Sequence, residues 1–262
     1  MGKITDALKK AAEERVGHIE KLNRVRATRL FVAQRTMESQ IDPRVVAFFD
    51  PKAAISEQYK ILRTNILALN KGNPPRTLVV TSSTQGEGKT ITCLNLAVAM
   101  VHSNRKTRVL LIDADMRRGR TAEYLGVKAE VGLSEVLKGE AELEQALYHV
   151  EAIENLTVLS SGAVPDHPVE LVDSTAMRDL LKTAATQFDM VIIDTPPIIS
   201  VTDAGIVGSI ADGVLMVVRA GKTQRGLVNR AEELLYQSHA KVLGRVLTNI
   251  EYHVPEYIYR YL

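Results

Sequence analysis

Residues 77–90 read TLVVTSSTQGEGKT and run directly into an apolar stretch, ITCLNLAVAM. A short β-branched run, then glycines, then a long apolar segment is typical of a strand, a turn and a helix. Gly86 and Gly88 allow the backbone N–H groups to point at phosphate oxygens in front of the helix N-terminus. Lys89 can reach the β- and γ-phosphates, and the Thr90 hydroxyl can bind magnesium. The stretch predicts a phosphate-binding loop rather than a plain glycine turn.

The loop is a variant of the usual pattern, because Ser83 occupies the position of its first glycine. In the septum-positioning and chromosome-partitioning ATPases, a second lysine lies five positions before the main one. That position is Thr84 here, which disfavours membership of that branch. We expect ATP to be contacted by Thr84, Gln85, Gly86, Glu87, Gly88, Lys89, Thr90 and Ile91.

Two later apolar runs end in aspartate, VLLIDAD at 109–115 and VIIDTPP at 191–197. Aspartates at i and i+2 of a strand point to the same side, and Asp113 and Asp115 have this spacing. Phosphorylation of a phenol, whose pKa is near ~10, calls for a carboxylate to accept the proton, a magnesium ion to align the phosphates, or both. Asp194 has the Walker B position, which holds magnesium directly or through water. Each signal is weak alone, since a strand-end aspartate can also belong to a turn.

The fold class follows from the alternation of short apolar runs with helical stretches after residue 75. Composition is that of a soluble globular protein, with 45% apolar and 24% charged residues. Near-continuous apolar strands separated by helices predict a doubly wound α/β domain with a mostly parallel sheet, a P-loop NTPase fold with ligands at the carboxyl ends of the strands. The expected strands are TLVVTS, RVLLIDAD, LTVLSS, MVIIDT, GVLMVVRA and VLGRVLTNI.

The first 50 residues are predicted to form a helical extension and linker, and residues 51–262 the P-loop domain with its tail. Apolar residues at helical spacing within 1–35 indicate one or two amphipathic helices. Their basic residues suit a membrane surface or an acidic partner, and a solvated helical face is an equal alternative. Residues 39–51, SQIDPRVVAFFDP, have the prolines of a linker or docking segment, and a helix is expected over 54–69.

Several classes of function are disfavoured. The single cysteine, Cys93, allows no intrachain disulfide and indicates a reducing compartment, hence the cytoplasm. No signal peptide and no apolar run near the ~20 residues of a membrane helix is evident, so we expect membrane association through a partner. A net charge of +2 gives no general reason for nucleic-acid binding, and the six histidines lack metal-ligand spacing.

Together SSTQGEGKT, VLLIDADMRRG and VIIDTPP resemble the Walker A, Walker A′ and Walker B motifs of the bacterial tyrosine kinases (BY-kinases), which control capsule and exopolysaccharide export. The resemblance covers about residues 55–262. It implies an ATP- and Mg²⁺-dependent protein-tyrosine autokinase. Lys89 and Thr90 would bind nucleotide phosphate and magnesium, Asp113 would be the base facing the acceptor hydroxyl, and Asp115 and Asp194 would serve the magnesium.

Arg117 and Arg118 follow the second motif as in the family, but two positions depart from its pattern. The usual proline is Gly119, and a frequent histidine is Ala122. Both differences bear on the shape of the loop that would meet the acceptor.

The family also carries an E-x-x-R-x-x-R motif for ring assembly, at Glu57, Lys60 and Arg63 in this chain. Residues at i, i+3 and i+6 share roughly one helix face, so pairing with a neighbouring subunit is feasible. Lysine lacks the bidentate fork of arginine, which weakens the expected homo-oligomeric ring. Ion pairs within the helix are the alternative.

The chain ends EYHVPEYIYRYL, which holds four of its eight tyrosines. The family autophosphorylates a C-terminal tyrosine cluster in trans, so the resemblance implies phosphoacceptors here. The alternative is an aromatic edge strand, because YIYRY alternates with period two. The candidate acceptors are Tyr252, Tyr257, Tyr259 and Tyr261.

The resemblance further implies partners. These are a membrane protein of the polysaccharide co-polymerase type that activates the kinase and recruits it to the inner face of the membrane, and a tyrosine phosphatase. Two other functions stay open on the sequence: an ATP-dependent positioning switch, and a non-catalytic module that binds nucleotide to organise a secretion complex.

Overall fold

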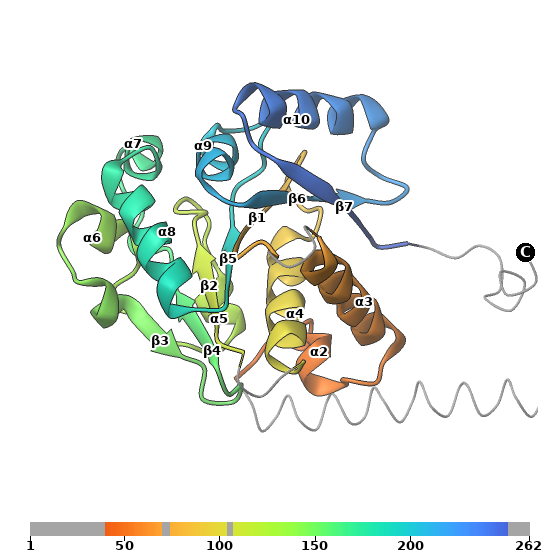
Figure 1. Cartoon of the computed structure of the whole chain (residues 1–262), viewed down its shortest axis with the longest axis horizontal. Coiled ribbons are helices and arrows are strands. Elements are labelled where there is room, and N and C mark those ends of the chain that lie inside the picture. The colour runs from red at the N-terminus through yellow and green to blue at the C-terminus, as the bar shows by residue number, and fades with distance from the viewer. Residues whose placement is uncertain (1–39, 70–73, 104–106, 251–262) are drawn as a thin grey trace, which may run out of the picture.

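The computed structural model describes residues 40–69, 74–103 and 107–250. A seven-stranded sheet in the order β3-β4-β2-β5-β1-β6-β7 forms its centre (Figure 1). Neighbouring strands are parallel except β3 and β4, which are antiparallel. The expected mostly parallel sheet is confirmed. The strands are β1 (Thr77–Ser82), β2 (Val109–Asp113), β3 (Leu147–His149), β4 (Leu156–Leu159), β5 (Met190–Asp194), β6 (Gly213–Arg219) and β7 (Val242–Thr248).

Helices cover both faces of the sheet, as in a doubly wound domain (Figure 1). Side chains of Leu78 and Val80 join a core beneath α2, α3 and α4, whereas Val79 joins a second core beneath α6 to α10. No helix in the described part of the chain is long and apolar enough to cross a bilayer. The helices are α2 (Val46–Phe49), α3 (Ala54–Ala68), α4 (Lys89–Val101), α5 (Thr121–Tyr124), α6 (Leu133–Lys138), α7 (Pro168–Val172), α8 (Thr175–Gln187), α9 (Asp203–Ile210) and α10 (Arg225–Gln237), with a 3₁₀ turn at Leu143–Ala146.

Two helices, α7 and α8, follow β4 in place of one continuous helix. Ser174 lies between them with extended backbone, and its hydroxyl accepts a hydrogen bond from the N–H of Met177 at 3.1 Å. A serine in this position satisfies a free N–H at the start of a helix and so begins a new one. The four-residue helices α2 and α5 were not expected, because so short a segment shows no helical period.

The segment before residue 50 packs on α4. Val45 and Phe49 are fully buried in the core on that face. The Asn95 side chain accepts from the N–H of Ala47 and donates to the carbonyl of Arg44, both at 2.9 Å. Residues 41–49 therefore dock on the domain rather than span a gap. Residues 1–39 lie outside the described part, so the N-terminal helices and the division at residue 50 stay predictions.

Strand order brings the predicted motifs to one edge of the sheet. β5 lies between β1 and β2, and its Asp194 pairs in register with Asp113 of β2 and with Val80 of β1. The loop that follows β1 therefore stands beside both carboxylates, at the carboxyl ends of the strands.

Candidate active site

The loop between β1 and α4 needs glycine at two positions. Gly86 and Gly88 have φ of +80° and +94°, in the left-handed region that other residues rarely adopt. Gly88 directly precedes α4, so the N–H groups of the first helical turn are directed out of the end of the helix. This arrangement is a ready site for an anion.

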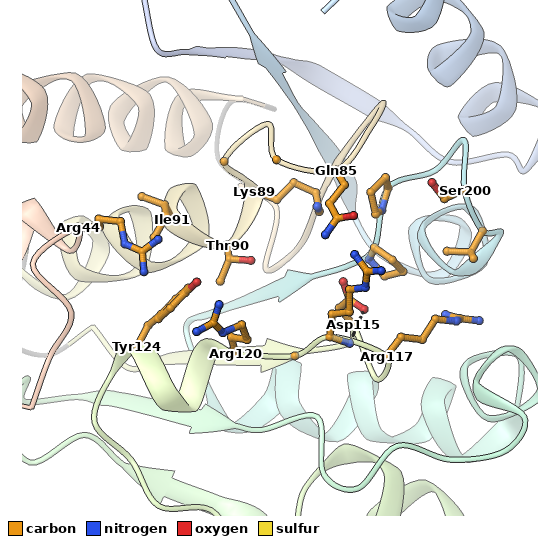
Figure 2. A pocket seen from close by; sticks show the side chains of 17 residues that line it. Arg44, Gln85, Lys89, Thr90, Ile91, Asp115, Arg117, Arg120, Tyr124 and Ser200 are labelled. Atoms are coloured by element: carbon orange, nitrogen blue, oxygen red, sulfur yellow. Dashed lines mark hydrogen bonds between the residues drawn. The ribbon is translucent and has the colours of Figure 1, made fainter.

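A cavity of about 810 Å³ opens in front of this loop. Figure 2 shows Arg44 and Tyr124 at one end, Arg117 at the other, and Lys89 and Asp115 between them. Six of the eight expected nucleotide contacts line the cavity: Gln85, Gly86, Gly88, Lys89, Thr90 and Ile91.

The other two expected contacts, Thr84 and Glu87, do not line the cavity. Glu87 is almost fully buried, and its carboxylate accepts from the N–H of Thr84 at 3.0 Å and from the hydroxyl of Thr223. Its carbonyl accepts from the hydroxyl of Thr248 at 2.7 Å. Glu87 therefore ties the loop to the segment that follows β6 and to the last residue of β7.

Thr90 lines the cavity and contacts Asp194, which is buried behind it and does not line it. The Thr90 hydroxyl donates to Asp194 Oδ2 at 2.6 Å, and Asp194 Oδ1 is buried with no hydrogen-bond partner among the described residues. Burial, together with the negative charge of Asp113, raises the pKa of Asp194 to about 7. A buried carboxylate oxygen without a partner calls for a ligand, and a hydroxyl beside it completes an oxygen donor set.

That donor set fits Mg²⁺. Magnesium in nucleotide sites is held by one or two carboxylates and by substrate phosphates, rather than by a cage of protein ligands. No group of three His, Cys, Asp or Glu side chains placed to hold a metal occurs in the described part of the chain. Thr90 and Asp194 would hold the ion together with the phosphates.

Asp113 and Asp115 differ in their surroundings, and the expectation that they point to the same side of a strand stays a prediction. β2 ends at Asp113, so the alternation does not extend to Asp115. Asp113 is buried, and its Oδ2 accepts from the N–H and the hydroxyl of Thr121 at 3.0 and 2.9 Å. Its Oδ1 accepts from the N–H of Asp115 at 3.2 Å. Asp115 lines the cavity and Asp113 does not, so the predicted role of Asp113 as base remains untested.

The packing around Gly119 explains why this chain has no side chain there. A Cβ at this position would lie 2.3 Å from Ser161 Oγ and 2.8 Å from Asp113 Oδ2. The loop after β2 therefore approaches Ser161 and Asp113 more closely than a side chain would allow.

Sequence reasoning missed three residues at one end of the cavity: Arg44, Arg120 and Tyr124. Arg44 comes from the segment docked on α4, and nothing in its spacing pointed to the site. Arg120 directly follows the second motif, so its place in the sequence could have indicated it. The sequence also gave no sign that Arg117 forms an ion pair with Asp203, a fully buried residue at the start of α9.

The residues expected at a subunit interface lie on α3 and do not line the cavity. Lys60 Nζ donates to Glu57 Oε1 and to the carbonyl of Pro51, both at 2.7 Å. Arg63 Nη1 donates to the carbonyl of Ala99 near the end of α4 at 2.8 Å. The ion pair within the helix, which was the alternative, is present between Glu57 and Lys60. The four C-terminal tyrosines lie outside the described residues.

Known proteins resemble this chain in sequence and in structure. A family model described as an AAA domain matches residues 76–237. The tyrosine-protein kinase YwqD of Bacillus subtilis is 39% identical over 209 residues, which cover 80% of this chain and 87% of that protein.

Two solved structures are similar over most of the chain. The chimerical protein CapA2B2 has a TM-score of 0.76 at 32% identity, covering 81% of this chain and 93% of that one. The kinase domain of the Escherichia coli tyrosine kinase ETK has a TM-score of 0.73 at 32% identity, covering 80% and 83%.

Proposed function

This chain belongs to the family of bacterial tyrosine-protein kinases, and from that premise we propose that it transfers the γ-phosphate of ATP to tyrosines of its own C-terminal stretch. The observation that supports this best is the meeting of three parts in one cavity. Lys89 begins α4, Thr90 lines the cavity with its hydroxyl bonded to Asp194, and Asp115 lines the same cavity. Phosphoryl transfer needs these parts: a phosphate cradle, a magnesium site and a carboxylate near the acceptor.

Each residue would have a defined role in that reaction. The N–H groups after Gly86 and the ammonium of Lys89 bind the β- and γ-phosphates. Mg²⁺, when bound by Thr90 and Asp194, aligns the phosphates and offsets their charge. The tyrosine oxygen forms a bond to the γ-phosphorus while the bond from that phosphorus to the β,γ-bridging oxygen breaks and ADP leaves. The phenolic proton passes to a carboxylate, and Asp115 is the one that the cavity exposes.

We further propose that the transfer occurs between subunits of a homo-oligomer. β7 ends at Thr248, beside the phosphate loop, and the four tyrosines follow within the next 13 residues. A tethered tail has a high effective concentration at a neighbouring site when subunits assemble. Each added phosphate carries nearly two negative charges, and the mutual repulsion of several phosphorylated tails would loosen the assembly.

We propose that this kinase regulates the export of capsule or exopolysaccharide. Its partners would be a membrane activator of the co-polymerase type and a tyrosine phosphatase, with recruitment to the inner face of the membrane by the activator. The described residues contain no membrane-spanning helix of their own, so such recruitment would need a partner or another segment.

The decisive test is transfer between two marked subunits. A Lys89→Met chain with an intact tail is mixed with an active chain whose four terminal tyrosines are phenylalanine, in the presence of ATP and Mg²⁺. Phosphotyrosine on the Lys89→Met chain, located by mass spectrometry, is the expected result. Lys182→Met, on the exposed side of α8, is the matched control and should keep full activity.

Two results would overturn parts of the proposal. ATP hydrolysis by the wild type without any phosphotyrosine would favour the positioning switch. Phosphotyrosine on the wild type, together with its absence from the Lys89→Met chain in the mixture, would show that transfer occurs within one chain.

A further inference from the structure

We propose that one end of the cavity, formed by Arg44, Arg120 and Tyr124 and called here the arginine arm, binds the glutamate that precedes an acceptor tyrosine. The kinase would thereby select Glu-Tyr sequences. This inference rests on the proposed kinase function and adds the substrate class that the site accepts: acidic peptides.

The arginine arm is built around one aromatic ring. The guanidinium carbon of Arg44 lies 4.6 Å from the centroid of the Tyr124 ring, and that of Arg120 lies 5.0 Å from it. Both distances allow cation–π attraction, which holds the two cations near the same ring. The three side chains line the same cavity as Lys89 and Asp115 (Figure 2).

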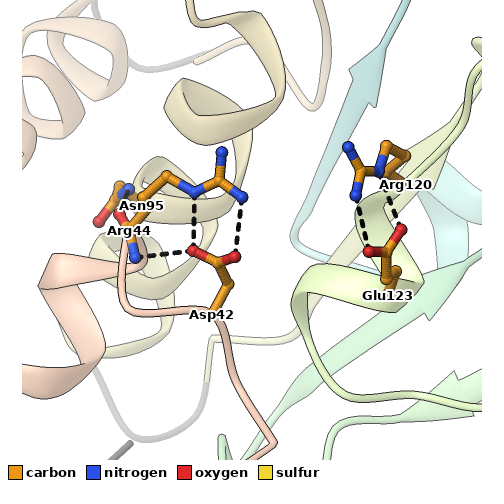
Figure 3. A network of polar contacts seen from close by, with 5 residues as sticks. All are labelled: Asp42, Arg44, Asn95, Arg120 and Glu123. Atoms are coloured by element: carbon orange, nitrogen blue, oxygen red, sulfur yellow. Dashed lines mark hydrogen bonds and ion pairs between the residues drawn. The ribbon is translucent and has the colours of Figure 1, made fainter. Parts of the chain in front are cut away.

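Two carboxylates fix the orientation of these guanidinium groups. Asp42 accepts from Nε and Nη2 of Arg44, both at 2.8 Å, and Glu123 accepts from Nε and Nη2 of Arg120 at 2.9 and 2.7 Å (Figure 3). Neither carboxylate engages the Nη1 nitrogen of its partner. Each arginine is thus held by one edge, which leaves Nη1 as a donor for a further acceptor without a large loss of side-chain entropy.

The backbone beneath Arg44 is also fixed. The side chain of Asn95, fully buried on α4, donates to the Arg44 carbonyl at 2.9 Å. Arg44 therefore projects from a docked segment and not from a free end of the chain.

Charge in the cavity favours an acidic ligand beyond the nucleotide. Five cationic side chains line it, against the single carboxylate of Asp115. Lys89 stands at the phosphate loop, and Arg117 is already paired with the buried Asp203. Arg44 and Arg120 are also paired, with Asp42 and Glu123, but only through Nε and Nη2, whereas Arg118 has no ion pair among the described residues.

The tail of the chain offers a matching pattern. Glu251 precedes Tyr252 and Glu256 precedes Tyr257, whereas Ile258 precedes Tyr259 and Arg260 precedes Tyr261. A carboxylate one residue before the acceptor can reach a guanidinium while the phenol faces the γ-phosphate. The arginine arm should therefore favour the first two tyrosines over the last two.

The test uses full-length chains and measures initial rates at each tyrosine by mass spectrometry. An active chain without tail tyrosines phosphorylates Lys89→Met acceptors that carry either the natural tail or Glu251→Gln with Glu256→Gln. Charged hydrogen bonds of this kind contribute enough that their loss lowers the rate by about tenfold. We expect that loss at Tyr252 and Tyr257 only.

Variants of the active chain identify the arm. Arg44→Gln with Arg120→Gln should cause the same loss on the natural tail and no further loss on the glutamine tail, with the KM for ATP unchanged. Arg230→Gln, an exposed arginine of α10 paired with Glu233, is the matched control. A thermal unfolding curve for each variant separates loss of the arginine arm from loss of the fold. Arg120→Lys keeps Tyr124 and the docked segment intact, so this variant should retain part of the selectivity for Glu-Tyr sequences.

The outcomes are distinguishable from failure of the kinase proposal. No phosphotyrosine from the wild type would defeat both. Phosphotyrosine at equal rates on glutamate and glutamine tails would overturn the arm while leaving the kinase in place. A raised KM for ATP in the arginine variants, with unchanged tyrosine selection, would assign the arm to the nucleotide and also overturn the inference.

Discussion

The hydroxyl of Thr90 donates a 2.6 Å hydrogen bond to the carboxylate of Asp194, which joins the first turn of α4 to the end of β5. If this pair holds magnesium, Asp194→Asn should weaken Mg²⁺-dependent ATP binding by about tenfold or more, because an amide cannot replace the charge of a carboxylate ligand. Binding measured by calorimetry with Mg²⁺ and with EDTA should differ strongly for the wild type and little for the variant.

The control for this substitution is Asp189→Asn, just before the other end of the same strand. Asp189 is exposed, and its Oδ2 accepts from the backbone N–H of Arg108 at 2.8 Å and lies 3.9 Å from Arg108 Nε. The Asp189→Asn variant should bind Mg²⁺-ATP with the same affinity as the wild type. Equal magnesium dependence in Asp194→Asn and wild type would refute the assignment.

Burial of the two aspartates predicts a pH dependence of stability in the absence of nucleotide. Burial raises the pKa of Asp194 to about 7 and that of Asp113 to about 6, from an ordinary value of 3.8. The folded chain therefore holds more protons on these groups than the unfolded chain between about pH 4 and 7. Their contribution to the free energy of unfolding should fall as the pH rises through that window and level off above it.

Urea unfolding at pH 4.5 and 7.5, in buffer with EDTA, measures this effect. Other carboxylates with lowered pKa values, such as Asp212, act in the opposite direction. The informative quantity is therefore the free energy of unfolding of the wild type minus that of Asp194→Asn, compared at the two pH values. Because asparagine does not titrate, this difference in the free energy of unfolding should be smaller at pH 7.5 than at pH 4.5. A difference independent of pH would contradict the prediction.

The sequence could predict the sheet and the phosphate loop because their signals are local. An apolar strand, a glycine turn and an apolar helix occur within 25 residues, and each strand-end aspartate is adjacent to its own strand. Strand alternation does not apply to Asp115, since β2 ends two residues earlier. Arg44 could not be predicted, because its place depends on Asn95, 51 positions away, which holds the docked segment.

Glu87 should support the phosphate loop without touching the nucleotide. It accepts from Thr84 and Thr223, and its carbonyl accepts from Thr248. Loss of one such bond costs ~1 kcal/mol, so Thr223→Val should weaken ATP binding by roughly fivefold. Glu87→Gln, which loses the charge of the acceptor, should have a larger effect. Thr186→Val, whose hydroxyl bonds only within α8, is the matched control. Unchanged ATP affinity in both loop variants would show that the loop holds its shape without Glu87.

Gly119 should not tolerate a side chain. The added Cβ of Gly119→Ala would lie within 2.3 Å of Ser161 Oγ and close to Asp113. Such overpacking costs ~1–3 kcal/mol, which thermal unfolding can detect. Ser161→Gly in the same chain should recover part of the loss, because it removes the nearest atoms. Gly226→Ala on α10, where the Cβ would meet nothing within 4 Å, should leave stability unchanged or raise it. A Gly119→Ala chain as stable as wild type would show that the loop can move.

The last prediction concerns assembly. Glu57 pairs with Lys60 on α3, and Arg63 is bound to the carbonyl of Ala99, so a subunit interface through this helix must exchange or share these bonds. Glu57→Ala should yield smaller species than wild type in light scattering, whereas Lys60→Arg, which restores a bidentate donor, should favour the larger species. Arg63→Ala also removes a contact between α3 and α4, so its effect alone would not separate assembly from folding. Glu170→Ala on the exposed α7 is the control and should not change the size.

Because a closed ring repeats one interface at every subunit, a small loss per interface should shift the whole distribution. A wild type that stays monomeric at every concentration, with tyrosine transfer between chains still present, would show that transfer needs only transient encounters.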